Sequence, residues 1–70
     1  MKIIVNGQEL EISYRVAVSY ANVVEYAGLS GSPSVTYNRG LSGAQGIMHV
    51  GEILPVVEGM IFNACHTGNA

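Results

Sequence analysis

The sequence predicts a single α+β domain, in which one helix covers one face of a four- to five-stranded mixed sheet. Three observations predict it: a strongly patterned hairpin at the start, one short amphipathic helix, and alternating apolar residues in later segments. A chain of 70 residues has room for one domain only. Its residues are 49% hydrophobic and 11% charged, which is typical of a folded domain and unlike a disordered tail.

The first twelve residues predict a β-hairpin. Asn6-Gly7 is the preferred centre of a two-residue type I′ turn, and alternating runs flank it on both sides. A register that pairs Val5 with Gln8 gathers apolar side chains on one face. That face carries Met1, Ile3, Leu10 and Ile12. The opposite face carries Ile4, Glu9 and Glu11.

A short helix is predicted between Ser19, a typical N-cap, and Gly28, a typical C-terminal stop. Apolar residues recur between them at helical spacing. They are Tyr20, Val23, Val24 and Ala27. Residues 14–18 before the helix could either extend the second strand or lead into the helix. Residues 28–33 after it predict a loop, because Pro33 continues neither a helix nor a central strand.

The second half of the chain predicts further strands. Residues 34–38 alternate as a half-buried strand does, and residues 39–46 form a polar, glycine-spaced connection. We expect residues 47–54 to be irregular and residues 55–65 to form a second hairpin that turns at Glu58-Gly59. One face of its last strand would carry Phe62 and Ala64, and the other Ile61, Asn63 and Cys65.

This ββαββ order is typical of a β-grasp, in which the first and last strands commonly lie parallel at the centre of the sheet. Residues 1–66 would form the domain and residues 67–70 a free C-terminal tail. The apolar run near the N-terminus stops after Val5, which is too short for a signal peptide or a membrane span. The single cysteine fits a reducing compartment. We therefore expect a cytoplasmic protein with no membrane partner.

The composition also bears on nucleic-acid partners. A net charge of -2 with three basic residues gives no phosphate-binding field, so we expect no nucleic-acid partner. The tyrosines are better explained by packing than by base stacking. They are Tyr14, Tyr20, Tyr26 and Tyr37. A phosphate-binding loop is not expected at the clustered glycines, which lack a following Gly-Lys-Ser/Thr and a helix. These are Gly40, Gly43 and Gly46.

Few residues offer catalytic or metal chemistry. Cys65 and His66 are adjacent in a strand and point to opposite faces, which favours a packed thiol over an activated nucleophile. His49 and His66 are too few ligands for a structural metal site. The glutamates are scattered along the sequence, so nothing requires them to converge. They are Glu9, Glu11, Glu25, Glu52 and Glu58. We expect no enzyme, no metal and no cofactor.

Several phrases of the sequence carry a family resemblance. They are "KIIVNG", "SYANVVEYAGL", "SVTYN", "GEILPVVEGMIFN" and, as the most specific, "VVEGMIFNACHTG". Across nearly its whole length the chain resembles the bacterial ubiquitin-related modifiers of the multiubiquitin type. The resemblance implies a ubiquitin-like β-grasp that acts as a protein modifier. It also implies three partner proteins: an activating enzyme, a conjugating enzyme and a JAB-type metallopeptidase. In this family they are encoded in operons similar to those linked to anti-phage defence.

Carried onto this sequence, the resemblance makes Gly68 the conjugating residue and Asn69 and Ala70 the segment that the peptidase removes. A glycine suits this position because a residue without Cβ can enter a narrow enzyme channel. Two alternatives remain: a non-covalent β-grasp interaction module and, third in order, a sulfur carrier. The sulfur carriers of this fold end in an untrimmed Gly-Gly, whereas Thr67 precedes Gly68 here.

Overall fold

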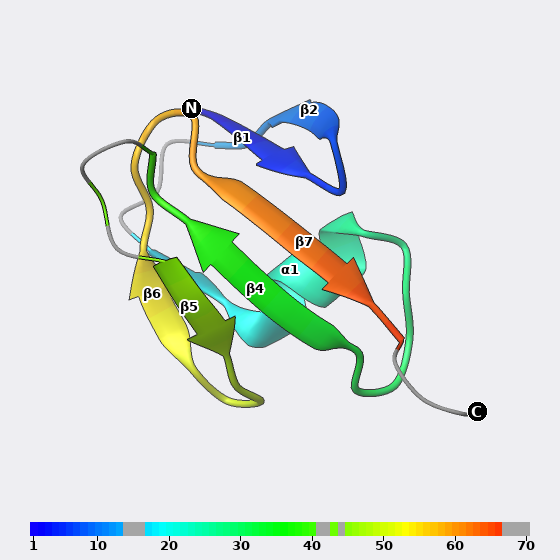
Figure 1. Ribbon diagram of the computed structural model, residues 1–70. Coiled ribbons are helices and arrows are strands. Elements are labelled where there is room, and N and C mark those ends of the chain that lie inside the picture. Colours follow the sequence, from blue (N-terminus) through cyan, green and yellow to red (C-terminus); the bar gives the residue numbers. More distant parts are fainter. Residues whose placement is uncertain (14–16, 41–42, 44, 67–70) are drawn as a thin grey trace.

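The computed structural model describes residues 1–13, 17–40, 43 and 45–66. These residues form the strands β1 (Lys2–Val5), β2 (Gln8–Glu11), β3 (Ala17–Ser19), β4 (Ser34–Asn38), β5 (Gln45–Met48), β6 (Ile53–Pro55) and β7 (Ile61–Cys65), and the helix α1 (Tyr20–Tyr26). Five strands build one sheet in the order β2-β1-β7-β4-β5, while β3 and β6 form a separate pair. Helix α1 lies against one face of the larger sheet (Figure 1). The last strand of the domain is therefore its central strand.

The first hairpin has the predicted register and turn. β1 pairs antiparallel with β2, and Val5 lies opposite Gln8. Asn6 and Gly7 have φ angles of 52° and 80°, as a type I′ turn requires at both central positions. Ile3 is fully buried, whereas Glu9 is exposed on the opposite face. Both the hairpin and its division into two faces are confirmed.

The helix also begins and ends where the sequence predicts. The Ser19 Oγ accepts a hydrogen bond from the Asn22 backbone N–H at 3.1 Å, and the Asn22 Oδ1 accepts one from the Ser19 N–H at 3.1 Å. This reciprocal capping box satisfies two backbone donors at the helix start. At the other end Gly28 adopts a φ of 73°, which favours glycine and stops the helix. Val23, on the inner face of the helix, is fully buried.

Strand β7 joins the two halves of the domain. It pairs parallel with β1 and antiparallel with β4, so the prediction that the first and last strands run parallel is confirmed. Phe62 and Ala64 are buried on the side that faces the core, as predicted. The Phe62 carbonyl also accepts a hydrogen bond from the Asn6 N–H at 2.9 Å, which ties β7 to the first turn.

The predicted second hairpin is wrong. A turn does occur at Glu58-Gly59, where Gly59 has a φ of 80°, but the preceding strand β6 does not pair with β7. A strand has two edges, and those of β7 are already taken by β1 and β4. The antiparallel partner of β4 is instead β5, so the second hairpin spans β4 and β5.

Residues 47–54, predicted to be irregular, contain the end of β5 and the start of β6. β6 pairs antiparallel with β3, with Val18 opposite Leu54. The Glu52 carbonyl accepts a hydrogen bond from the Tyr20 N–H at 2.9 Å, which fixes this small sheet beside the helix start. The sequence left open whether residues 14–18 extend the second strand or lead into the helix. Ala17 and Val18 belong to β3, a separate strand that leads directly into the helix. Residues 14–16 lie outside the described residues.

The buried apolar side chains form one core between the sheet, the helix and the β3–β6 pair. It consists of Ile3, Val5, Ile12, Val18, Tyr20, Val23, Val24, Val35, Met48, Val56, Met60, Phe62 and Ala64. The protein is thus a small α+β domain with a mixed five-stranded sheet, an architecture compatible with a β-grasp. In the part of the chain that the structure describes, no helix has the length and apolar character needed to cross a membrane.

Candidate functional site

The candidate site is the end of the domain where β7 ends and the chain continues to His66, which we call the exit. Because β7 runs parallel to β1, this exit lies at the opposite end of the sheet from Lys2, the start of β1 (Figure 1). The last paired residue, Cys65, lies opposite Ser34 of β4. Cys65 and His66 are both exposed. The end of the central strand is therefore accessible to solvent at Cys65 and His66.

Hydrogen bonds hold this exit in place. The Ala64 backbone N–H donates to the Asn6 Oδ1 at 2.7 Å, so the first turn clamps the end of β7. On the other side, the buried Tyr20 hydroxyl donates to the Pro33 carbonyl and fixes the loop after the helix. A Cβ placed on Gly31 would lie 3.7 Å from the His66 Cε1, so this loop borders the exit. Asn6 thus holds Ala64 near the end of β7, and the loop after the helix lies beside His66.

A mainly apolar groove adjoins the exit. It has a volume of about 530 Å³ and runs between the helix and the loop that follows it. Tyr20 and Val24 line it from the helix, Leu29 and Gly31 from the loop, and Val50 from the β5–β6 turn. Because Gly31 also borders His66, the groove and the end of β7 lie next to each other.

The prediction of a packed Cys65 thiol is wrong, since Cys65 is exposed. Phe62 and Ala64 take the core side of β7, so Cys65 shares the outer face with Asn63. The helix covers only the other face of this sheet (Figure 1). Burial of Cys65 would need a second layer that the described residues do not form.

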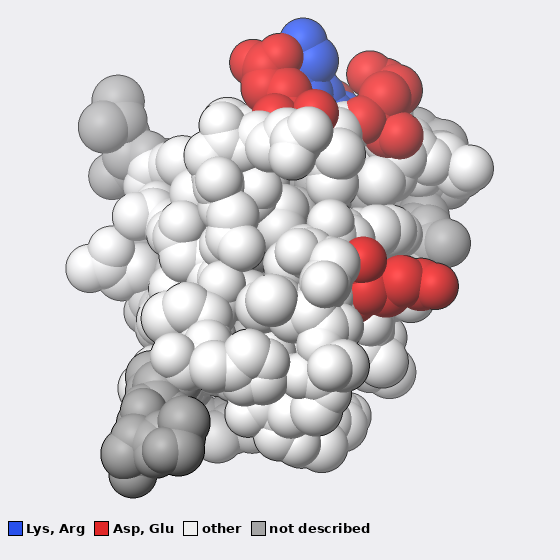
Figure 2. Space-filling view, turned by 90° about the vertical axis from the view of Figure 1, so that its right-hand side faces the viewer, with Lys and Arg blue, Asp and Glu red and all other residues white. Residues whose placement is uncertain are grey.

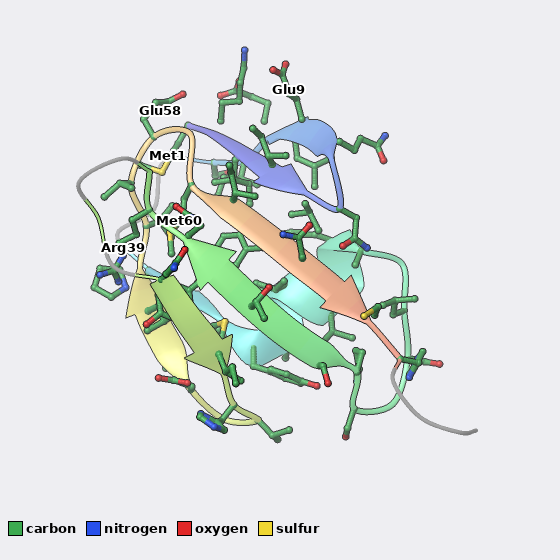
Figure 3. All side chains as sticks on the ribbon, in the orientation of Figure 1. Met1, Glu9, Arg39, Glu58 and Met60 are labelled. Atoms are coloured by element: carbon green, nitrogen blue, oxygen red, sulfur yellow. The ribbon has the colours of Figure 1, made fainter. Side chains whose placement is uncertain are left out.

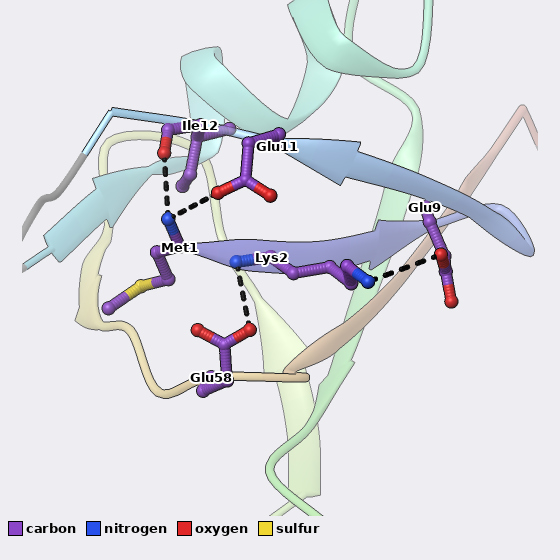
Figure 4. A network of polar contacts seen from close by, with 6 residues as sticks. All are labelled: Met1, Lys2, Glu9, Glu11, Ile12 and Glu58. Atoms are coloured by element: carbon purple, nitrogen blue, oxygen red, sulfur yellow. Dashed lines mark hydrogen bonds and ion pairs between the residues drawn. The ribbon is translucent and has the colours of Figure 1, made fainter.

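Three glutamates contact the first two residues of the chain, each at a different group (Figure 4). The N-terminal ammonium lies 2.7 Å from the Glu11 Oε2, and the Lys2 Nζ lies 3.6 Å from the Glu9 Oε1. The Lys2 N–H donates to the Glu58 Oε2 at 3.1 Å. The hairpin register and the turn at Glu58 thus bring three glutamates to residues 1 and 2, but among the described residues they form no carboxylate cluster that could hold a metal ion.

The hydrogen bonds to Glu11 and Glu52 do not prepare these two carboxyl groups for proton donation. The hydrogen bond from the N-terminal ammonium lowers the pKa of Glu11, and a backbone hydrogen bond from His49 lowers the pKa of Glu52. The His49 N–H lies 2.8 Å from the Glu52 Oε1, and its Nδ1 lies 3.3 Å from the same atom. A carboxyl group that acts as a general acid near neutral pH needs a raised pKa. Both groups are shifted in the opposite direction.

Charged side chains are few over most of the face seen in Figure 2. Figure 2 shows acidic and basic groups gathered at the end of the molecule that carries β1 and β2, and one further acidic group at the margin. Glu9 and Glu58 lie at this end with Met1, whereas Arg39 lies apart (Figure 3). The Arg39 guanidinium carbon lies 5.7 Å from the Tyr37 ring centre, and an amino group donates to the Pro55 carbonyl at 3.3 Å.

The remaining sequence candidates have structural roles. Tyr20 is buried, and Tyr26 and Tyr37 pack against the core, while Tyr14 lies outside the described residues. Gly46 belongs to β5, where the Tyr37 ring covers it. Within the described ranges, no three His, Cys, Asp or Glu side chains gather as a metal site would require.

The predicted conjugating residue Gly68 and the predicted removable residues Asn69 and Ala70 lie outside the described residues. These assignments remain predictions. Comparisons with protein-family models, with curated protein sequences and with solved structures gave no match for this chain. Sequence reasoning missed the clamp between Asn6 and Ala64 and the groove beside the exit, because both join segments that are distant in the chain.

Proposed function

We propose that this protein is a ubiquitin-like modifier of the cytoplasm, with a β-grasp fold and Gly68 as its conjugating residue. The observation that carries the proposal is the exit: the last strand is the central strand of the sheet and releases the chain into solvent at His66. A modifier needs a rigid domain for recognition and an accessible terminus for chemistry. The resemblance of the sequence to bacterial ubiquitin-related modifiers gives this arrangement its chemical interpretation.

The proposed reaction sequence begins with a JAB-type metallopeptidase. It hydrolyses the Gly68–Asn69 bond, so that water adds across the peptide and the Asn69-Ala70 dipeptide leaves. An activating enzyme then joins the Gly68 carboxylate to the AMP moiety of ATP and releases pyrophosphate. An enzyme thiol displaces AMP to form a thioester, which passes to a conjugating enzyme and then to a nucleophilic side chain of a target protein. Anti-phage defence is the setting that the resemblance favours.

Trimming can be tested by mass spectrometry of the full chain after incubation with the metallopeptidase. We expect a product that is lighter by one Asn and one Ala residue. Gly68→Val should block the cut, because a β-branched residue obstructs close approach at this position. The matched control Ala70→Val places the same side chain beyond the bond and should be trimmed normally. An unchanged mass for the wild-type chain with active peptidase would contradict the proposal.

A non-covalent interaction module is the second candidate, and the uncovered outer face of the sheet favours it. This face has a shallow hollow of about 460 Å³, lined by uncharged side chains that include Thr36, Asn63 and Ile47. A module would keep its binding when the chain is cut after Thr67, whereas a modifier would lose its function. A sulfur carrier, the third candidate, would show a C-terminal thiocarboxylate in the mass spectrum.

A further inference from the structure

The chain offers very few amines as acceptors for a covalent bond. Its 70 residues contain a single lysine, Lys2, and the other amine is the N-terminal ammonium of Met1. An amine that attacks a thioester forms a stable amide, and the attack needs an amine whose nitrogen the acyl group can approach. The first two residues carry both candidate acceptors, and the contacts in Figure 4 distinguish them.

The N-terminal ammonium is held against the first hairpin. It donates to the Glu11 Oε2 at 2.7 Å and to the Ile12 carbonyl at 3.0 Å. The Met1 side chain beside it is 11% exposed. A hydrogen bond from an ammonium to a carboxylate is among the stronger kinds, and both bonds must break before an acyl group reaches the nitrogen. The fold therefore withholds the N-terminal amine.

Lys2 is held at its backbone and accessible at the end of its side chain. Its N–H donates to the Glu58 Oε2 at 3.1 Å, and its carbonyl accepts a hydrogen bond from the Gly59 N–H at 2.8 Å. The side chain is 49% exposed, and its Nζ lies 3.6 Å from the Glu9 Oε1. An exposed ion pair of this length contributes little and opens readily. The fold thus presents the Lys2 amine from a fixed place on β1.

A single copy of the chain cannot bring its own C-terminus to this lysine. The start of β1 and the end of β7 lie at opposite ends of the sheet (Figure 1). Because Ile4 pairs with Ile61, the levels of Lys2 and Cys65 along these strands differ by about 20 Å. The three residues from Cys65 to Gly68 reach at most about 10 Å, and the four-carbon stem of lysine does not span the rest. A bond between Gly68 and Lys2 must therefore join two copies.

We propose that Lys2 is the acceptor site at which one copy of this protein receives the Gly68 carbonyl group of a second copy, an inference that rests on the proposed function. The Lys2 amine attacks the carbonyl carbon of the thioester, the enzyme thiolate leaves, and one proton passes from the nitrogen to the sulfur. The products are one amide bond between the copies and a free enzyme thiol. Each copy then has one donor and one acceptor at opposite ends of the sheet, so repeated addition gives an unbranched chain.

Limited acetylation of the full chain with N-hydroxysuccinimidyl acetate tests the acceptor without any enzyme. The ratio of label on Lys2 to label on Met1 should be at least about threefold higher in the folded chain than in urea, where the hydrogen bonds of Met1 are lost. Glu11→Gln removes the charge from one of those bonds and should lower the ratio. Glu25→Gln makes the same change at an exposed position of the helix and should leave the ratio unchanged. An equal ratio for the folded and unfolded chains would overturn the proposal.

The enzymatic test uses the chain that ends at Gly68, with the activating and conjugating enzymes. We expect a two-copy product in which mass spectrometry locates the new amide at Lys2. Lys2→Arg keeps the charge beside Glu9 and supplies no nucleophile, so the two-copy product should fall at least about tenfold while thioester formation stays unchanged. A wild-type chain that forms the thioester without a two-copy product, or that is linked at Met1, would overturn this proposal alone. Absence of the thioester would overturn the proposed function as well.

Discussion

The two hairpins of the domain have the same antiparallel geometry and opposite surface chemistry. β1–β2 turns through Asn6-Gly7, carries glutamates on its edge strand, and is tied to the N-terminal ammonium. β4–β5 has an uncharged edge strand with an exposed Ile47. The charged edge discourages further pairing, and the neutral edge permits it. The two edges of the sheet therefore differ in charge, although among the described residues neither pairs with a further strand.

Both hairpins depend on β7, which lies between them. Phe62, the second residue of β7, is fully buried and lies opposite Val5 of β1 and Tyr37 of β4. The strand that holds the two halves together is also the strand that presents the exit. Loss of packing at Phe62 should therefore affect both hairpins and the exit together.

Phe62→Ala gives the largest expected effect. Truncation of a buried phenylalanine costs about 3–5 kcal/mol in the free energy of unfolding, which approaches the total stability of a small domain. Urea unfolding followed by circular dichroism measures the change. The neighbouring Asn63→Ala, on the exposed outer face, should change the stability little. If both variants unfold at the same urea concentration, β7 is not the shared support.

Asn6→Ala should weaken the first hairpin and the exit by about 1–3 kcal/mol, and leave the second hairpin largely intact. Alanine is strained at a φ of 52° and cannot accept the hydrogen bond from the Ala64 N–H. Asn6→Gly relieves the strain but still lacks the acceptor, so it separates the two causes. Amide hydrogen exchange at Ala64 should accelerate in both variants. Unchanged exchange would mean that the clamp does not hold the exit.

Gly46→Ala tests the second hairpin with a smaller effect, about 1 kcal/mol. A Cβ at Gly46 would lie 3.1 Å from the Tyr37 hydroxyl oxygen, so the ring must shift slightly. Tyr37→Phe removes that oxygen and should recover part of the loss in the double variant. Thermal unfolding of the two single variants and the double variant measures this coupling. Strictly additive losses would show that the contact with the hydroxyl does not limit the site.

The smallest effect is a pH dependence of the charged edge. The N-terminal ammonium lowers the pKa of Glu11 in the folded protein, so the stabilisation is fully present above the ordinary glutamate pKa. It is lost as the pH falls from the ordinary glutamate pKa, about 4.3, through the lower pKa of the folded state. Unfolding measured from pH 7 to pH 2 should therefore show a shallower acid loss for Glu11→Gln. Identical slopes for variant and wild type would contradict this linkage.

The predictability of the two hairpins differs for physical reasons. Asn6-Gly7 specifies its turn locally, and the alternation around it fixes the register, so the first hairpin follows from a short stretch of sequence. In β5 the exposed Ile47 sits beside the buried Met48, which hides the period of two. In β6 Pro55 argues against a strand, although it is accommodated at the end of a short two-stranded pair.

Part of the candidate site could likewise be predicted from the sequence, and part of it could not. The place of β7 at the sheet centre could be predicted from the order of elements, but its partner could not be predicted from the turn at Glu58-Gly59. That choice depends on which strand edges are free, and β4 comes from a distant part of the chain. The burial of Cys65 failed as a prediction for a related reason, since exposure depends on whether a second layer covers the outer face.

The proposal that Gly68 is the conjugating residue is tested most directly by pyrophosphate exchange with the activating enzyme. The chain is made in three lengths, ending at Thr67, Gly68 and Ala70. We expect rapid ATP-dependent exchange for the chain that ends at Gly68, and background exchange for the other two. Addition of the metallopeptidase should restore exchange to the chain that ends at Ala70 and not to the chain that ends at Thr67. Equal exchange by the chains that end at Thr67 and Gly68 would contradict the proposal.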